Sequence, residues 1–377
     1  TEYIKKDFNR RNIMIKAVII GFSHMHVNEM AKYLFEHPDF DLCAASPVQS
    51  ASKDIAPFRY TALWNLENVR NNYCSNIYDD YRQMIETEKP DIAFILTENV
   101  QKCAVALECI KRGINLCIEK PVAMNAHEAR TIKKAADNHG VEVVVNWPVV
   151  WREYLHKIKH FADSNIVGTP IKLHYLNGHT GPLGIGAKHR GVTETAEEMT
   201  DTDRAQTWWY NKNRGGGAYL DICCYGAMFT RWILGKGALA AESTGMNLAT
   251  PYADTEDNTA SVIRYDTKLS VIEGTWTMPR KLVPSGPTVL CTKGALKCTD
   301  FAEGNPDVIG YDVYGNSLDL SGFKLGKEFT NMAYHYAEHI KTGKPVYEML
   351  TLDANIEVME ILDACIKSNE TKKEEYI

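Results

Sequence analysis

The chain has 377 residues, which is long for a single hydrophobic core and therefore predicts two domains. Hydrophobic residues make up 45% of it and charged residues 24%, the balance of an ordinary globular protein. The net charge is −6 and the basic residues are dispersed, which argues against a nucleic-acid-binding surface. No apolar stretch is long enough to span a membrane and the start is polar, so a cytoplasmic protein is expected.

The cysteine pattern favours neither disulfides nor zinc. Ten cysteines are present, and no two are spaced as Cys-x-x-Cys. Most lie in apolar segments, where a free thiol behaves as a small buried hydrophobe. Examples are Cys43, Cys103, Cys109 and Cys117. Cys223 and Cys224 are adjacent, but no histidine stands at a spacing suited to activating either as a nucleophile.

Apolar runs alternate with helical patterns through the first 147 residues. Strands are predicted at 16–20, 42–45, 91–96, 114–118 and 141–145. Helices are predicted around Met30, Leu34 and Phe35, which we place on one face, and over 81–86, 101–112 and 126–139. The last begins with a capping box, in which Asn125 is the N-cap and Glu128 follows three residues later. This alternation predicts a doubly wound parallel sheet, which binds ligands at the carboxyl ends of its strands.

The turn after the first strand is where a dinucleotide-binding fold carries Gly-x-Gly-x-x-Gly. Here only the first glycine is present, because the stretch reads Gly21-Phe22-Ser23-His24-Met25-His26. Ser23 is small enough for a close backbone approach, whereas His26 widens the contact between helix and strand. The acid expected after the second strand is replaced by Ser46, so NAD and NADP are not distinguished. The cofactor contacts expected here are Gly21, Phe22, Ser23, His24, Met25 and Ser46.

His24 and His26 also suggest a metal pair. They stand one residue apart on a turn that should face a pyrophosphate, with no nearby carboxylate or thiolate to complete a shell. We therefore expect loop packing or phosphate contact, and no metal site.

Two short segments carry the candidate chemistry. Glu119-Lys120-Pro121 closes the apolar run 114–118 and places a cation at a strand end. About a hundred residues later, Gly215-Gly216-Gly217 leads to Asp221 and Tyr225. These two are four residues apart and share a face if the segment is helical. A cation, an acid and a phenol can together move a proton beside a redox cofactor.

The second half reads mainly as strands separated by turns. Strands are predicted at 171–177, 238–248, 259–265, 269–277, 287–291 and 295–299. Asp266-Thr267-Lys268 and Lys293-Gly294 are the turn signals between them.

Taken together, these segments resemble the glucose–fructose oxidoreductase / inositol dehydrogenase / MocA family, from about Ile15 to Ile366. The residues that carry the resemblance are Thr97-Glu98-Asn99, Glu119-Lys120-Pro121, Asn146, Val167-Gly168-Thr169-Pro170 and the segment 215–225. The resemblance implies a Rossmann domain over 1–147. It also implies a C-terminal α/β domain over 148–377 with a large open, mainly antiparallel sheet.

The resemblance further implies a cofactor, its contacts and an assembly. The cofactor is NAD or NADP, and the implied contacts are Thr97, Asn99, Glu119, Lys120 and Asn146. The implied partners are a small carbohydrate-like substrate and a second copy of the chain, in a homodimer or homotetramer formed through the open sheet. No nucleic acid or membrane partner is expected.

The chain departs from the family pattern, which is usually Asp-x-Gly-x-His-x-x-Asp. From Asp221 onward, Cys223 replaces the glycine, Tyr225 the usual catalytic histidine and Met228 the second acid. Tyrosine at this position is similar to the glucose–fructose oxidoreductase branch, where it is thought to act as the acid or base. The loop 179–200 is an additional departure.

Oxidation of a secondary alcohol requires a hydride acceptor and a base for the hydroxyl proton. Tyrosine has an ordinary pKa of about 10, and a nearby ammonium lowers it. We expect Tyr225 to transfer the proton, Lys120 to tune it and hold the substrate oxygen, and Asp221 to orient a neighbouring hydroxyl. Pro121 fixes the backbone after Lys120, and a cis bond is one way to do so. A surface lysine, a structural acid and a packed tyrosine are the structural alternatives.

Substrate contacts are expected from His179, His189 and Arg190 of the additional loop, because a long loop in a compact domain is usually functional. Trp208 offers a ring face to the apolar side of a sugar, with core packing as the alternative. The leading interpretation is an NAD(P)-dependent dehydrogenase or reductase for a sugar, polyol or related cyclic alcohol. The alternatives are a glycoside-cleaving enzyme that recycles its cofactor through transient oxidation, and a non-catalytic nucleotide-sensing regulator.

Overall fold

The structure is a computed structural model that describes residues 14–50, 58–183, 199–277, 286–299 and 306–377. The described residues form two compact units. Those within 1–147, 188–208 and 327–353 belong to the first unit, and those within 148–187, 209–326 and 354–377 to the second. The segment 327–353, which follows residues 209–326 of the second unit in sequence, therefore returns to the first.

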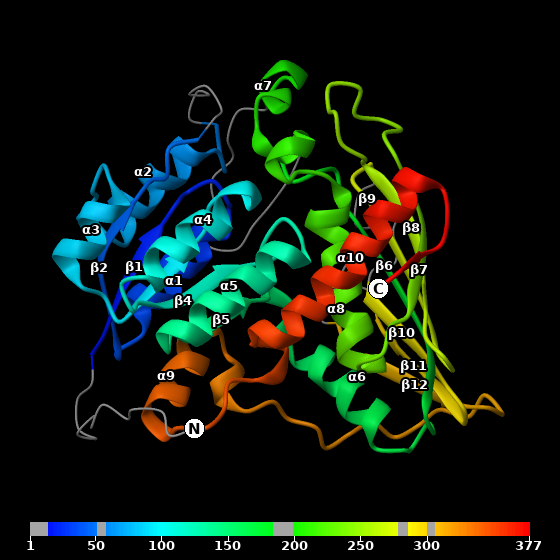
Figure 1. The fold of residues 1–377 in the computed structure, drawn as a ribbon. Helices are drawn as coiled ribbons and strands as arrows, with labels where there is room; N and C mark the ends of the chain where they lie inside the picture. The colour runs from blue at the N-terminus through cyan, green and yellow to red at the C-terminus, as the bar shows by residue number, and fades with distance from the viewer. Residues whose placement is uncertain (1–13, 51–57, 184–198, 278–285, 300–305) are drawn as a thin grey trace. The chain divides into compact units, whose positions relative to one another are not determined.

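A parallel sheet of five strands forms the centre of the first unit (Figure 1). The strands are β1 Ile15–Ile20, β2 Phe40–Ser46, β3 Ile92–Ile95, β4 Asn115–Glu119 and β5 Val143–Asn146. Their order is β2–β1–β3–β4–β5, and each predicted strand of this half is present. The order reverses between β1 and β3, the kind of position where open α/β sheets bind ligands.

The helices of the first unit are α1 Val27–Glu36, α2 Ala62–Asn72, α3 Tyr81–Glu88, α4 Asn99–Ile110, α5 Ala126–His139, α7 Asp201–Ala205 and α9 Met332–Thr342. Short 3₁₀ helices are η7 Lys327–Phe329 and η8 Glu348–Leu350. Asn125 caps α5 as predicted, accepting from the amide of Glu128 at 2.9 Å. The reciprocal bond of the predicted capping box is not formed, because Glu128 accepts from the amide of Met124, one residue before the N-cap.

The prediction that Phe35 shares the buried face of α1 is wrong. Met30 and Leu34 are buried, whereas Phe35 is 59% exposed. Successive residues of a helix are rotated by about 100° from one another, so a side chain directly after the buried Leu34 turns toward solvent.

The second unit contains an eight-stranded sheet in the order β12–β11–β10–β6–β9–β8–β7–β13. Its strands are β6 Pro170–Gly178, β7 Ala240–Met246, β8 Asn258–Arg264, β9 Leu269–Thr275, β10 Gly286–Cys291, β11 Gly294–Cys298, β12 Val308–Asp312 and β13 Glu375–Tyr376. Neighbours are antiparallel except β6 and β9, which pair in parallel. The six predicted strands are present, and the edge strands β12 and β13 add to them.

Helices cover one face of this sheet (Figure 1). They are α6 Glu153–Asp163, the continuous helix η4 Tyr219–Cys223, α8 Cys224–Phe229 and η5 Thr230–Leu234, and α10 Leu352–Thr371. Shorter helical turns are η1 Pro148–Trp151, η2 Trp208–Tyr210 and η3 Lys212–Arg214, and Trp208 of η2 belongs to the first unit. The segments η4 and η5 are π-helical. Residues Ser270 and Ile272 of β9 are buried beneath the covering helices, and the alternate residues of the strand lie on the opposite face.

All ten cysteines are free, as predicted, and eight of them are buried. Within the described part of the chain, no helix combines the length and the apolar character needed to cross a bilayer.

Candidate active site

Lys120 lies at the carboxyl end of β4, directly after the last residue of the strand. It is 2% exposed, and its amide donates to the carbonyl of Asn146 at the end of β5 (3.3 Å). The peptide bond between Lys120 and Pro121 is cis, one of the arrangements considered from the sequence. The predicted strand-end position of this lysine is thus present in the fold, within the first unit.

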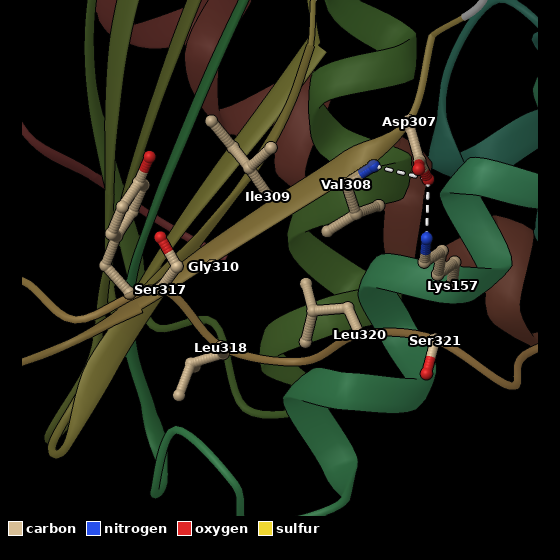
Figure 2. Close-up of a pocket in the computed structure, with 10 residues that line it drawn as sticks. Lys157, Asp307, Val308, Ile309, Gly310, Ser317, Leu318, Leu320 and Ser321 are labelled. Carbon is tan, nitrogen blue, oxygen red and sulfur yellow. Dashed lines mark hydrogen bonds and ion pairs between the residues drawn. The ribbon is translucent and has the colours of Figure 1, made fainter.

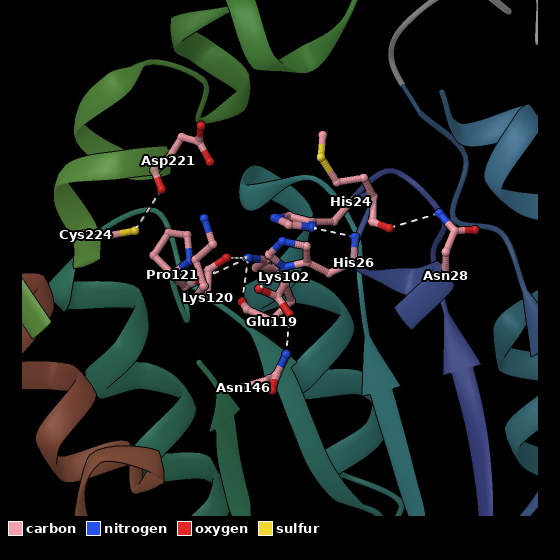
Figure 3. Close-up of polar contacts among 11 residues, drawn as sticks. His24, His26, Asn28, Lys102, Glu119, Lys120, Pro121, Asn146, Asp221 and Cys224 are labelled. Carbon is pink, nitrogen blue, oxygen red and sulfur yellow. Dashed lines mark hydrogen bonds and ion pairs between the residues drawn. The ribbon is translucent and has the colours of Figure 1, made fainter. Parts of the chain in front are cut away.

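The neighbouring carboxylate of Glu119 is held by two side chains (Figure 3). Its Oε1 lies 2.9 Å from Nδ1 of His26, and its Oε2 accepts from the amide nitrogen of Asn146 at 2.8 Å. Burial raises the pKa of the Glu119 carboxyl, but His26, Lys120 and Asn146 together outweigh burial and hold the pKa below its ordinary value. Glu119 is therefore an ionised group inside the first unit.

The expectation that no carboxylate lies near the histidine pair is wrong. The candidate ligand atoms of His24, His26 and Glu119 all lie within 4.8 Å of one another. Both oxygens of Glu119 already have partners, however, and a buried ammonium, that of Lys102, donates to the Glu119 carbonyl at 2.7 Å. A cation so close disfavours a second one, so we interpret the cluster as a hydrogen-bonded network.

The turn after β1 fits a bound dinucleotide at its first position. Gly21 has a φ of +89°, and a Cβ added there would lie 2.5 Å from Cγ2 of Thr97, so only glycine suits this position. Two amides of the turn are already used within the protein. That of His24 donates to the Leu96 carbonyl at 3.1 Å, and that of His26 donates to Nδ1 of His24 at 3.2 Å. Fewer amides therefore face a pyrophosphate than in a full glycine turn.

The remaining predicted cofactor residues lie around this turn in the first unit. Phe22, Ser23, His24, Met25, Ser46, Thr97 and Asn99 are all buried. The hydroxyl of Ser46 donates to the Pro47 carbonyl at 3.1 Å, at the end of β2. The end of β2 thus offers a hydroxyl where other dinucleotide folds offer a carboxylate.

Trp208 belongs to the same unit, although it follows the additional loop in sequence. It is 4% exposed, and its indole N–H donates to the carbonyl of Ser23 at 3.0 Å. Its ring lies 6.2 Å from that of His24. The structure therefore uses Trp208 to support the turn, which is the packing alternative considered from the sequence.

In the second unit, the triple glycine introduces the helix that carries Asp221 and Tyr225. Gly217 has a φ of +103°, and a Cβ there would lie 2.4 Å from Oε1 of Glu256. The same carboxylate oxygen accepts from the amide of Tyr219 at 3.0 Å, at the first residue of η4. Burial raises the pKa of Glu256, an effect that the Tyr219 amide opposes. Glycine is needed here because the capping carboxylate occupies the space of a side chain.

Asp221 is fixed by two residues at the ends of adjacent strands. Gly178 of β6 pairs with Thr275 of β9, so His179 and Trp276 follow side by side. The indole N–H of Trp276 donates to Oδ2 of Asp221 at 3.0 Å, and Nε2 of His179 lies 3.6 Å from the same oxygen. The structure thus brings together Asp221 and His179, which the sequence analysis assigned to catalysis and to substrate contact.

Tyr225 begins the turn after Asp221 in the same continuous helix and is partly exposed. Burial raises the pKa of the neighbouring Tyr175, and Tyr225 adds to that effect. Asp221 and Tyr225 belong to the second unit, and Lys120 belongs to the first. His189 and Arg190 lie outside the described residues.

Three residues of these surroundings were not predicted from the sequence: Lys102, Glu256 and Trp276. Lys102 was detectable, because it occupies a position of α4 that alternates with Val105, Ala106 and Cys109 on the buried face. Glu256 and Trp276 gave no local signal, because their roles depend on contacts across the sheet.

A shallow depression of about 320 Å³ lies elsewhere in the second unit, along β12 (Figure 2). The ion pair between Lys157 and Asp307, 2.7 Å long, closes one end of it. Leu318 and Leu320 are among its apolar lining residues. Its lining includes none of the predicted site residues.

Comparison with known proteins places both units. A family model described as the oxidoreductase family with an NAD-binding Rossmann fold, GFO_IDH_MocA, matches residues 15–147. The model of the GFO/IDH/MocA C-terminal domain matches residues 157–297. Trans-1,2-dihydrobenzene-1,2-diol dehydrogenase of Mus musculus is 23% identical over 158 residues, 42% of this chain and 41% of that protein. The chain matches less than half the length of the first curated relatives.

Solved structures share the whole fold. An aldose–aldose oxidoreductase from Caulobacter crescentus, complexed with glycerol, superimposes with a TM-score of 0.74 at 14% identity. It covers 97% of this chain and 100% of its own. An Agrobacterium radiobacter oxidoreductase in complex with NAD+, L-tartaric acid and magnesium gives 0.72 at 13% identity, covering 96% and 98%. At these identities the likeness establishes a common fold.

Proposed function

Because the chain belongs to the Gfo/Idh/MocA oxidoreductase family, we propose that it transfers a hydride between a nicotinamide cofactor and a secondary alcohol. The alcohol belongs to a sugar, a polyol or a related cyclic compound. The observation that carries the proposal is the buried Lys120 at the end of β4, beside the ionised Glu119, in a unit whose family model is described as NAD-binding.

The first unit would hold the cofactor, which when bound accepts or donates the hydride. Gly21 would allow its backbone to approach closely, since no side chain fits there. We assign the other contacts to the turn and to the neighbouring strand ends. They are Phe22, Ser23, His24, Met25, Ser46, Thr97, Asn99, Glu119, Lys120 and Asn146. The hydroxyl of Ser46 fits either NAD or NADP, because it carries no charge to repel a 2′-phosphate.

For the proton, we assign transfer to Tyr225, tuning and substrate-oxygen binding to Lys120, and orientation of a neighbouring hydroxyl to Asp221. Asp221 suits this role because Trp276 restricts its carboxylate from one side. His179, on the other side of that carboxylate, presents an imidazole to the same hydroxyl. We retain His189 and Arg190 as further substrate contacts, and we assign Trp208 to support of the turn after β1, because its indole donates to the Ser23 carbonyl.

Cofactor binding is tested first, by quenching of tryptophan fluorescence with NADH and with NADPH. One of the two should bind and quench. Turnover is then followed at 340 nm against a panel of sugars, inositols and cyclic diols. Absence of quenching by both dinucleotides, together with no turnover on the panel, contradicts the proposal.

Tyr225→Phe separates proton transfer from binding. Turnover should fall by about a hundredfold or more, because general acid–base groups contribute about 10²–10⁴-fold, while NADH affinity stays unchanged. His179→Gln should chiefly raise KM, since this residue is assigned to the substrate. Full activity in Tyr225→Phe would move proton transfer to Lys120 or His179.

Location and assembly complete the proposal. All ten thiols are free, which suits a reducing compartment, and we place the protein in the cytoplasm. We place the contact of a homodimer or homotetramer on the uncovered face of the eight-stranded sheet. Apolar side chains stand there among polar ones, with Val262, Leu290, Ile309 and Tyr311 each about two-fifths exposed.

A further inference from the structure

Lys102 of α4 is a lysine in a position built for an apolar residue. It is 0% exposed and lies on the face of the helix that buries Val105, Ala106 and Cys109. Burial of an ammonium is costly unless its donors are satisfied, so the residue requires a specific role to be tolerated here. Its contacts indicate that role.

The ammonium of Lys102 donates to three consecutive backbone carbonyls (Figure 3). The distances from Nζ are 2.7 Å to the Glu119 oxygen, 3.2 Å to that of Lys120 and 2.7 Å to that of Pro121. A lysine ammonium has three N–H donors, which equals the number of these acceptors. Lys102 thus binds the backbone at Lys120 and on both sides of it.

The contacts of Lys102 begin at the last residue of β4, where the hydrogen bonds between β4 and β5 end. The register of β4 with β5 ends at the pair Glu119 and Asn146, followed by the hydrogen bond from the Lys120 amide at 3.3 Å. Carbonyls beyond that point are outside the ladder. The ammonium of Lys102 donates to the two that follow, those of Lys120 and Pro121.

We propose that Lys102 is the positioning residue for Lys120, which it fixes through the carbonyls of Glu119, Lys120 and Pro121. This inference rests on the proposed function, in which Lys120 meets the substrate oxygen. Lys102 acts through the backbone and contacts no reacting atom. Its removal should free the amine of Lys120 before it affects the rest of the unit.

The chemical reactivity of Lys120 is the direct test, and it requires no substrate. Trypsin cleaves after Arg112 and Arg130 but not before proline, so the peptide 113–130 contains Lys120 as its only lysine. Labelling with acetic anhydride, followed by mass spectrometry of this peptide, measures that amine alone. The mean labelling of the other lysines is the internal reference.

Lys102→Met removes the donors while keeping the length of the side chain. Labelling of Lys120 should rise by about tenfold or more, because each hydrogen bond from a charged donor is worth about that factor. Lys102→Arg retains charge and donors and should stay within about threefold of the wild type. Lys133→Met removes a lysine on α5 that is 30% exposed and should change nothing.

Folding is checked by circular dichroism and thermal unfolding. If Lys102→Met does not fold, Lys102→Gln, which is also neutral, undergoes the same labelling. Unchanged Lys120 labelling in a folded neutral variant overturns the proposal. So does failure of both neutral variants to fold, because Lys102 would then serve the stability of the whole unit.

Turnover separates this inference from the proposed function. On a substrate found in the panel, Lys102→Met should lower kcat by about tenfold or more, a larger effect than on NADH affinity or KM, because Lys120 serves both binding and proton transfer. A wild type without NADH binding and turnover overturns the proposed function, whereas the labelling result for Lys120 stands by itself.

Discussion

At the scale of single residues, Gly21 makes the sharpest prediction. Gly21→Ala should lower the free energy of unfolding by about 2 kcal/mol, through the left-handed backbone and the contact with Thr97. Urea denaturation measures the loss. Gly113→Ala is the matched control, because Gly113 has a φ of +72° but nothing within 4 Å of its added Cβ. An equal loss in both variants would show that the contact with Thr97 contributes nothing.

Glu119 makes stability depend on pH. Burial raises the pKa of Glu119, but His26, Lys120 and Asn146 lower it by more than burial raises it. The folded pKa therefore lies below the unfolded value of about 4.3. A depressed pKa stabilises the protein above the unfolded value, and this contribution is lost as pH falls through the folded pKa. The gap in unfolding free energy between wild type and Glu119→Gln should therefore shrink from pH 6 to pH 3. A constant gap would contradict the assignment.

The site residues differ in how far the sequence could predict them. Lys120 and Asp221 were found because they stand in recognisable motifs, and the fold places Lys120 at the end of β4 and Asp221 in the helix η4. The partners of Asp221 could not be found in this way. Trp276 and His179 meet at it because β6 and β9 pair in parallel register, and no local pattern encodes that pairing. Lys102 was detectable as an inward lysine of α4, but its acceptors lie at the end of β4 and directly after it.

At the scale of elements, the helix 219–234 packs against β6 and β9, and Gly226 allows a close approach. Gly226 faces Ile272 and Tyr175, and an added Cβ would lie 2.3 Å from Cγ2 of Ile272. Gly226→Ala should therefore destabilise by about 1–3 kcal/mol, although alanine favours helices by about 1 kcal/mol. In an Ile272→Ala background the same change should cost less, because the contact that remains is the one of 3.0 Å with Cδ1 of Tyr175. Additive losses in thermal unfolding would contradict this account.

Sequence patterns located most strands of both sheets, but they did not predict two short edge strands or the π-helical segments. The edge strands β12 and β13 were missed, and β13 has only two residues, too few to show an alternating pattern. The π-helical turns η4 and η5 follow from packing against the sheet, which helical periodicity does not express. Asp221 therefore lies on a helix, which the sequence analysis treated as a condition, but on one with a wider turn.

At the scale of the whole molecule, the uncovered face of the eight-stranded sheet predicts an assembly. Wild-type protein should show the mass of a dimer or tetramer by light scattering, and the double variant Val262→Glu, Leu290→Glu should shift toward the monomer. Leu63→Glu is the control, because Leu63 is also 40% exposed but lies in the first unit. A monomeric wild type would contradict the proposed assembly.

The return of residues 327–353 to the first unit affects how the chain is made. Strand β5 of that unit contacts η8 and forms an isolated bridge between Val144 and Thr351, which are far apart in synthesis. During translation the Rossmann sheet emerges more than half a chain before these late partners. The nascent first unit therefore lacks these partners of β5 until the ribosome has made nearly the entire protein. We expect chaperones to bind it during that interval.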